Sequence, residues 1–168
     1  MAEIRVLDKH TAELIAAGEV VERPASVAKE LLENAIDAGA TQITLSAARG
    51  GIAQLQIADN GTGIEAEYID KAFIRHATSK IATADDLGHI HTEGGEPQGM
   101  EPGARPVGTT ITVNDLFYNT PARMKFLKKD ASEGTFVSET VLHAALSHPE
   151  ISFRFLRDGK QQFLTPGD

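Results

Sequence analysis

The feature that most constrains the fold is an amphipathic stretch over residues 20–39, followed directly by two short alternating segments. Its apolar side chains recur at the i, i+3, i+4 and i+7 spacing of a helix: Val20, Val21, Pro24, Val27, Ala28, Leu31, Leu32 and Ala35. Pro24 suits a first helical turn and Gly39 suits a helix end. Residues 42–48 and 53–58 then alternate as strands do, around an Arg49-Gly50-Gly51 turn. The pattern predicts a helix followed by a β-hairpin.

Further elements are expected along the rest of the chain. They are a helix over 9–17 between Asp8 and Gly18, a short helix over 65–73, a strand over 110–113, a helix over 136–146, and a hairpin around Asp158-Gly159. Residues 88–108 are rich in Gly and Pro without periodicity, which predicts a loop. A loop of that length without structure of its own is unusual inside a compact domain.

Composition places the chain among globular proteins and excludes several functions. Its 168 residues suit one domain, and the absence of Cys excludes disulfides and thiolate metal sites. The net charge of −8 argues against a generally basic, nucleic-acid-coating surface. No apolar run of about 18 residues is present and the first residues lack a signal-peptide pattern, so a cytosolic protein is expected.

Two polar residues lie one turn apart on the first predicted helix. On a helical wheel Glu30 and Asn34 fall on the shoulder of the apolar stripe, half sheltered, whereas Lys29 and Glu33 point away as solvated charges. A carboxylate and an amide in this arrangement can share a metal ion or a water molecule. The alternative is a rim acid hydrogen-bonded to a neighbouring amide.

The stretch IADNGTGI, residues 57–64, ends an apolar strand in an acid, an amide and two glycines. The carboxylate of Asp59 could accept hydrogen bonds from an amino group and a water, as an adenine edge would offer. Gly61 and Gly63 can take positive φ and let a ligand approach the backbone. The pattern does not fit a calcium loop, a dinucleotide-binding fingerprint or a P-loop. A purely structural turn remains the alternative.

Two weaker signals follow. Thr78, Ser79 and Lys80 place two hydroxyls and a cation in a row, which suits phosphate oxygens, although most such tripeptides are ordinary surface. Gly108, Thr109 and Thr110 open an apolar strand, where a hydroxyl could join the Asp59 site. Each signal is weak when taken singly.

The order of these features resembles a known family. AAGEVVERPASVAKELLENAIDAGAT, DNGTGI, RHATSK, PVGTT and LFYNTPARMKFLK are similar to the N-terminal ATPase domain of the MutL DNA mismatch-repair proteins, in the GHKL superfamily. DNGTGI alone is shared with type II topoisomerases, heat-shock chaperones and histidine kinases. The long first stretch together with LFYNTPAR is much narrower and points to MutL.

The resemblance implies roles for the candidate residues. Glu30 would be the catalytic general base that activates water, and Asn34 would hold Mg²⁺ against the phosphates of ATP. Asp59 would bind the adenine amino group with the help of Thr109 through a water. Gly61 and Gly63 would shape the pocket floor, and residues 78–80, which are Thr78, Ser79 and Lys80, would lie near the phosphates.

The resemblance also implies an α+β fold, a two-layer α/β sandwich of the GHKL (Bergerat) type with helices on one face of a mixed, mostly antiparallel sheet. One departure matters. The family carries a further glycine motif of the form GFRGEAL, which is missing between Lys80 and Gly108. We therefore expect an ATP-binding domain over 1–168 that lacks a lid segment at about residues 92–93. The family's transducer and C-terminal dimerisation domains are expected to be absent from this chain.

The function implied is that of a DNA mismatch-repair switch, which binds and slowly hydrolyses ATP with Mg²⁺ to control homodimerisation. The partners implied are the mismatch-recognition protein MutS, a nuclease, a helicase and DNA, in a bacterial cytosol. The basic segment over 121–129 could line a DNA-contacting surface, but a solvated basic segment is the favoured interpretation. The alternatives are a nucleotide-binding adaptor that does not hydrolyse ATP because the lid is lost, and another GHKL ATPase such as a topoisomerase domain.

Overall fold

The computed structural model describes residues 21–63, 88–93, 96–102, 107–118 and 120–168. The chain forms two compact units, one comprising Val21–Gly61 with Gly108–Asp168 and the other comprising Met1–Val20 with Thr62–Val107. The helices predicted over 9–17 and 65–73 lie outside the described residues.

Helix α2, Pro24–Asp37, confirms the helix predicted between Pro24 and Gly39. Pro24 occupies the first turn, where a missing N–H costs no helical hydrogen bond. The helix ends as Ala38 donates its N–H to the carbonyl of Asn34 at 3.0 Å. Gly39 follows with φ 71°, a left-handed conformation that favours glycine.

The hairpin predicted after this helix is also present. Strands β1, Gln42–Ala48, and β2, Gln54–Asp59, pair antiparallel, with Leu45 opposite Ile57. Their inward side chains are buried and their outward ones are half-buried or exposed, which is the alternation that the sequence shows. The connection is the 3₁₀ turn η1, Arg49–Gly51, in which both glycines have positive φ.

Five strands form the sheet of this unit in the order β5-β2-β1-β6-β7. The remaining three strands are β5, Thr110–Asn114, β6, Ser152–Arg157, and β7, Lys160–Leu164. Only β1 and β6 run parallel, and the other pairs of this sheet are antiparallel. The sheet is therefore mixed and mostly antiparallel, as expected.

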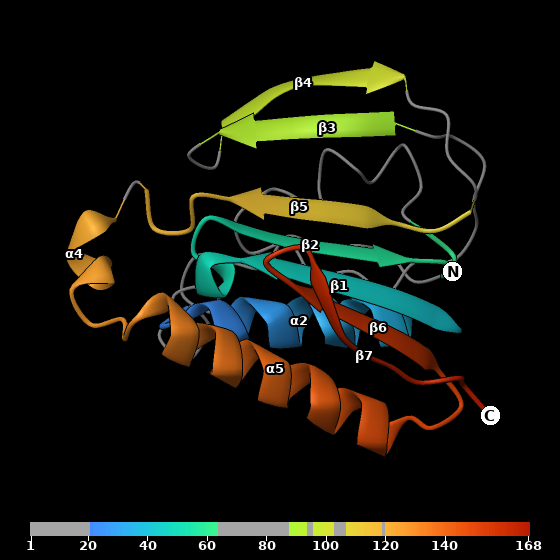
Figure 1. The fold of residues 1–168 in the computed structure, drawn as a ribbon. Coiled ribbons are helices and arrows are strands. Elements are labelled where there is room, and N and C mark those ends of the chain that lie inside the picture. Colours follow the sequence, from blue (N-terminus) through green and yellow to red (C-terminus); the bar gives the residue numbers. More distant parts are fainter. Residues whose placement is uncertain (1–20, 64–87, 94–95, 103–106, 119) are drawn as a thin grey trace, which may run out of the picture. The chain divides into compact units, whose positions relative to one another are not determined.

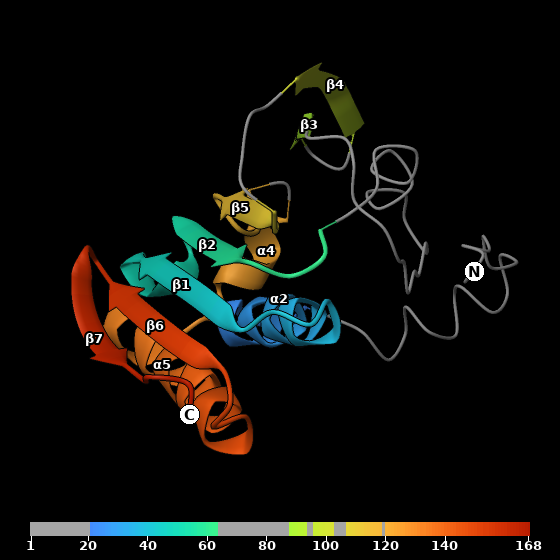
Figure 2. The same ribbon diagram turned by 90° about the vertical axis from the view of Figure 1, so that its right-hand side faces the viewer.

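The two long helices lie on the same face of this sheet (Figures 1 and 2). Helix α5, Asp130–Ser147, contains the predicted helix over 136–146 and begins six residues earlier. The core fills the space between the helices and the sheet with buried side chains from both layers, among them Leu31, Leu32, Val137, Val141, Ile43, Leu45, Ile57, Phe153 and Phe155. The fold is thus an α+β two-layer sandwich. Within the described residues, no helix is long and apolar enough to cross a membrane.

The loop predicted over 88–108 is wrong for most of its length. Strands β3, Gly88–Glu93, and β4, Glu96–Pro102, form a separate antiparallel pair. Thr92 and Glu93, the expected junction of a lost segment, are consecutive residues of β3. Glycine and proline hid the strands because a two-stranded sheet has only edge strands, where proline is tolerated.

Candidate functional site

Asp59 lies at the end of β2, where the sequence places it, and its side chain is only 7% exposed. Its Oδ1 accepts hydrogen bonds from the backbone N–H of Gly61 at 2.8 Å and of Thr109 at 3.3 Å. The backbone N–H of Asp59 in turn donates to the carbonyl of Thr109 at 2.9 Å. Two backbone amides therefore fix the orientation of this carboxylate before any ligand arrives.

Two glycines allow the backbone to close tightly around Asp59. A Cβ on Gly61 would lie 2.8 Å from the carbonyl oxygen of Ala38, at the end of α2. Gly108 has φ 126°, and a Cβ there would collide with the carbonyl oxygen of Asp59. In both places the missing side chain makes room for neighbouring backbone. These glycines therefore allow the segments around Asp59 to pack closely.

The two glycines of the DNGTG stretch differ in conformation. Gly63 has φ 78°, as the sequence suggested, whereas Gly61 is not in the left-handed region. Gly61 is needed for close packing rather than for a turn. Gly63 belongs to the other compact unit.

Asn60 serves to join two strands. Its Oδ1 accepts the N–H groups of Thr41 and Gln42, both at 2.8 Å, and its Nδ2 donates to the hydroxyl of Thr41 at 2.9 Å. The end of β2 and the residues 60–61 after it therefore form a turn and a candidate site at once. Asn60 holds the end of β2 to the start of β1, and this leaves Asp59 beside it in a fixed place.

Glu30 and Asn34 are more exposed than predicted. Both side chains are exposed on α2. The helical wheel predicted that they would be half sheltered on the shoulder of the apolar stripe. The buried stripe of α2 consists of Pro24, Ala25, Ala28, Leu31, Leu32 and Ala35, and it does not extend to Glu30 or Asn34. Lys29 and Glu33 are solvated, as predicted, and form a helical ion pair at 3.6 Å.

The C-terminal end of α2 adjoins Asp59 through a chain of contacts. The carbonyl of Asn34 accepts the N–H of Ala38, Ala38 lies against Gly61, and the N–H of Gly61 donates to Asp59. Because a helix turn is rigid, the position of Asn34 is coupled to that of the carboxylate. The fold therefore brings together Asp59, Gly61, Thr109 and the helix that carries Glu30 and Asn34.

Other predicted site residues are not placed by the structure. Thr78, Ser79 and Lys80 lie outside the described residues. No group of three or more His, Cys, Asp or Glu side chains in the described ranges could hold a metal ion. The assignment of Asn34 to a metal stays a prediction.

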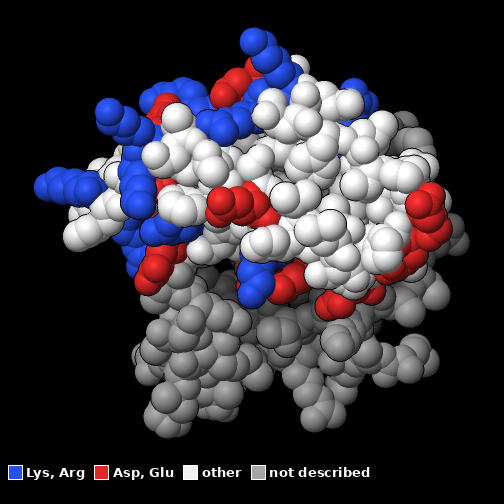
Figure 3. Space-filling model, turned by 60° about the horizontal axis from the view of Figure 1, so that its bottom comes forward, with Lys and Arg blue, Asp and Glu red and all other residues white. Residues whose placement is uncertain are grey.

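The basic segment after β5 makes contacts with the rest of the fold that were not predicted from the sequence. Helix α4, Pro121–Met124, begins this segment, and Arg123 donates a hydrogen bond from Nη1 to the carbonyl of Val21 at 2.6 Å. Lysine and arginine side chains gather on this side of the molecule, at the left in Figure 3. Glu133, in the first turns of α5, is fully buried, and its Oε1 accepts the backbone N–H of Lys128 at 2.8 Å. Part of the segment is therefore tied to the fold.

Comparison with known proteins assigns the chain to a family. The model of the histidine kinase-, DNA gyrase B- and HSP90-like ATPase family matches residues 22–131. The chain therefore belongs to this ATPase family. Within it, the resemblance to the ATPase domains of MutL proteins is confirmed by similar sequences and similar structures.

Two MutL DNA mismatch repair proteins illustrate the sequence similarity. The protein of Agathobacter rectalis is 42% identical over 202 residues, which take in the whole of this chain and 31% of that protein. The protein of Shouchella clausii is 44% identical over 200 residues, again with the whole of this chain and 31% of that protein. The chain thus spans about a third of the length of these curated relatives.

Solved structures of the Aquifex aeolicus MutL ATPase domain share the fold. The domain complexed with ADP is 29% identical and superimposes with a TM-score of 0.76, over 89% of this chain and 65% of that one. A second structure of the domain, from the bacterial mismatch repair endonuclease, is 33% identical with a TM-score of 0.77, over 88% of this chain and 62% of that one.

The alignments also reveal a difference in length. The alignment with the Agathobacter rectalis protein runs over 202 residues and includes all 168 residues of this chain. At least 34 aligned residues of that relative therefore have no counterpart here.

Proposed function

We propose that this chain is the ATP-binding domain of a MutL-type mismatch-repair switch, and that the intact protein binds and slowly hydrolyses ATP. The observation that carries the proposal is the buried carboxylate of Asp59, oriented by two backbone amides at a strand end. An ADP complex of a similar Aquifex aeolicus domain supports a nucleotide as the ligand.

In this proposal Asp59 accepts a hydrogen bond from the exocyclic amino group of adenine. A carboxylate discriminates well here because guanine presents a carbonyl oxygen at the same position, which would leave two acceptors facing each other. Thr109 assists through a water, and Gly61 and Gly63 form the pocket floor. Thr78, Ser79 and Lys80 contact the phosphates.

Glu30 acts as the general base. It accepts a proton from a water as the water oxygen bonds to the γ-phosphorus, while the bond to the β–γ bridging oxygen breaks to release ADP and phosphate. The exposure of Glu30 on α2 supports this role, because the carboxylate is accessible to a water and a nucleotide.

The residues present fit a magnesium ion. The side-chain oxygen of Asn34 is a hard, exposed donor of the kind that Mg²⁺ accepts together with waters and phosphate oxygens. The ion would neutralise phosphate charge. Asn34 would hold it from α2, one turn beyond Glu30.

We further propose that the family's lid is missing from this chain, because at least 34 aligned residues of a relative lack a counterpart here and the sequence lacks the glycine motif before Gly108. Nucleotide binding through Asp59 survives that loss better than hydrolysis, which needs the phosphates to be enclosed. The parent protein would work in the bacterial cytosol as an ATP-dependent homodimer with MutS, a nuclease, a helicase and DNA. The adaptor alternative differs only in the absence of turnover.

The test is a calorimetric titration of Asp59→Asn with an adenine nucleotide. The amide replaces one acceptor oxygen with a donor, so we expect affinity to fall by about tenfold or more. Asp115→Asn is the matched control, since Asp115 is exposed and its left-handed φ of 48° tolerates asparagine. Equal affinity of both variants and the wild-type chain would remove Asp59 from the pocket.

A further inference from the structure

Helix α2, which carries Glu30, begins without a capping side chain of its own. Its N-cap residue is Arg23, whose side chain makes no cap hydrogen bond, and its first turn contains no acidic residue. Helices usually fix their first turn with Ser, Thr, Asp or Asn at this position. Contacts from elsewhere in the fold can fix the start of α2 instead.

Arg123 supplies the first of these contacts. Its Nη1 donates to the carbonyl of Val21, three residues before the helix, at 2.6 Å. The two residues are 102 positions apart in the chain. A guanidinium is a strong donor because it is charged, so the contact ties α4 to the point where α2 begins.

Phe136 on α5 supplies the second contact. The guanidinium carbon of Arg23 lies 4.7 Å from the centroid of its ring, and Nζ of Lys128 lies 5.2 Å from the same centroid. Both distances are within the range of a cation–π interaction. The backbone N–H of Lys128 is held in turn by the buried carboxylate of Glu133 at 2.8 Å. We call Arg123, Arg23, Phe136 and Lys128 the clasp.

We propose that the clasp positions Glu30 for hydrolysis and that Arg123 is its principal positioning residue, an inference that rests on the proposed function. Glu30 lies less than two turns from the start of α2, and a helix moves as a rigid rod over that length. A shift of the first turn is therefore passed to the carboxylate. The N–H groups that orient Asp59 belong to Gly61 and Thr109, which are not part of α2, so nucleotide binding is affected less.

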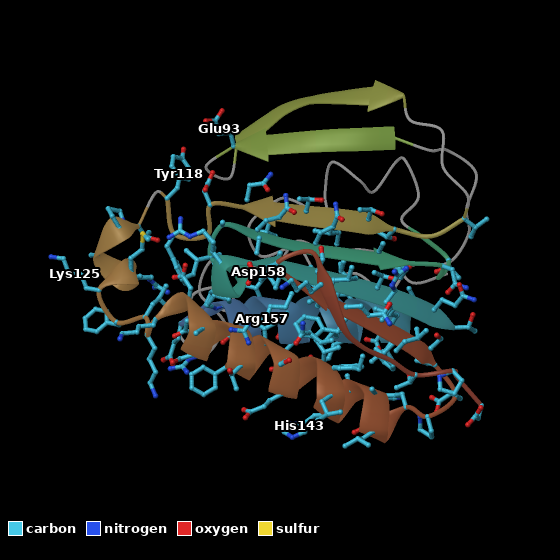
Figure 4. The ribbon with its side chains drawn as sticks, in the orientation of Figure 1. Glu93, Tyr118, Lys125, His143, Arg157 and Asp158 are labelled. Carbon is cyan, nitrogen blue, oxygen red and sulfur yellow. The ribbon has the colours of Figure 1, made fainter. Side chains whose placement is uncertain are left out.

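Lys125 provides a matched control in the same segment. Replacing Lys125 by Ala removes one positive charge, as Arg123→Ala does. The Lys125 side chain, however, makes no hydrogen bond or ion pair within the described residues. Figure 4 shows it pointing away from α4 and from the sheet. Arg123→Ala, Arg123→Lys and Lys125→Ala thus separate the contact from the charge.

The experiment compares these variants by hydrogen exchange of the first-turn amides of α2, by adenine-nucleotide affinity, and by single-turnover hydrolysis. For Arg123→Ala we expect first-turn exchange about tenfold faster, with nucleotide affinity within about twofold of wild type and turnover reduced about tenfold. Arg123→Lys should restore part of the turnover, since an ammonium can still donate to a carbonyl. Lys125→Ala should match wild type in all three measurements.

Failure of the clasp and failure of the proposed function give different results. If the wild-type chain binds no nucleotide, the proposed function is wrong, and so is the role given to Arg123. If the wild-type chain binds and hydrolyses, the clasp is overturned by first-turn exchange that is the same in Arg123→Ala and Lys125→Ala, or by unchanged turnover in Arg123→Ala. If it binds without turnover, unchanged amide chemical shifts of Glu30 in Arg123→Ala overturn the positioning role.

Discussion

At the scale of single residues, the candidate site depends on what the backbone does around Asp59. A buried carboxylate needs hydrogen bonds, and here the N–H groups of Gly61 and Thr109 both donate to its Oδ1. The acid is therefore held in one orientation by groups that cannot move without unfolding the strand end. Such a carboxylate can accept a hydrogen bond from a ligand without changing its own orientation.

Glu30 is expected to separate binding from turnover. Glu30→Ala should bind ATP with near wild-type affinity but lose about 10²–10⁴-fold in hydrolysis, because the proton acceptor for the attacking water is gone. Single-turnover hydrolysis next to a binding titration measures both quantities. Glu33→Ala on the same helix is the control, as its side chain is solvated and paired only with Lys29. A parallel loss of binding and turnover in Glu30→Ala would contradict the general-base role.

At the scale of elements, the site exists because β2, the segment before β5 and the end of α2 pack so closely that backbone meets backbone without a side chain between them. Gly108, two residues before β5, lies directly against the carbonyl of Asp59, and Gly61 lies against Ala38. A side chain at either position would push a strand or a helix away from the acid. The approach of these elements thus depends on two residues that have no side chain.

Gly108→Ala should destabilise the fold by about 2–4 kcal/mol, since both the backbone conformation and the space are wrong for a Cβ. Gly159→Ala is a suitable control, because Gly159 also has a positive φ, 76°, but a Cβ there meets nothing within 4 Å. Its cost should be about 1–2 kcal/mol from the backbone alone. Urea unfolding measures both variants, and equal costs would show that β5 adapts freely.

At the scale of the whole molecule, the difference in length from the relatives bears on activity. A chimaera that receives the unmatched residues of the Shouchella clausii protein, which aligns over 200 residues, should hydrolyse ATP at least about tenfold faster than this chain. Both proteins should bind nucleotide similarly, because the backbone contacts that orient the Asp59 carboxylate are already present in this chain. Equal single-turnover rates in the two proteins would argue that enclosure of the phosphates is not what limits hydrolysis here.

The elements that could be predicted from the sequence are those set by local patterns. Helix α2, strands β1 and β2, the hairpin of β6 and β7 and the place of Asp59 at a strand end could all be predicted, because apolar periodicity and turn residues act over a few residues. The pair of β3 and β4 was missed because glycine and proline mask a strand that has a single neighbour.

The amino-acid sequence was enough to predict helix α2, the two hairpins, the acid at the end of β2 and the ATPase family, because these depend on local patterns and on motifs. Three further features became visible only in the tertiary structure: Glu30 and Asn34 are exposed, Gly61 and Gly108 lie directly against neighbouring backbone, and Arg123 contacts the segment before α2. The reason is that these facts depend on which distant segments meet, and periodicity along one segment carries no information about its neighbours in space.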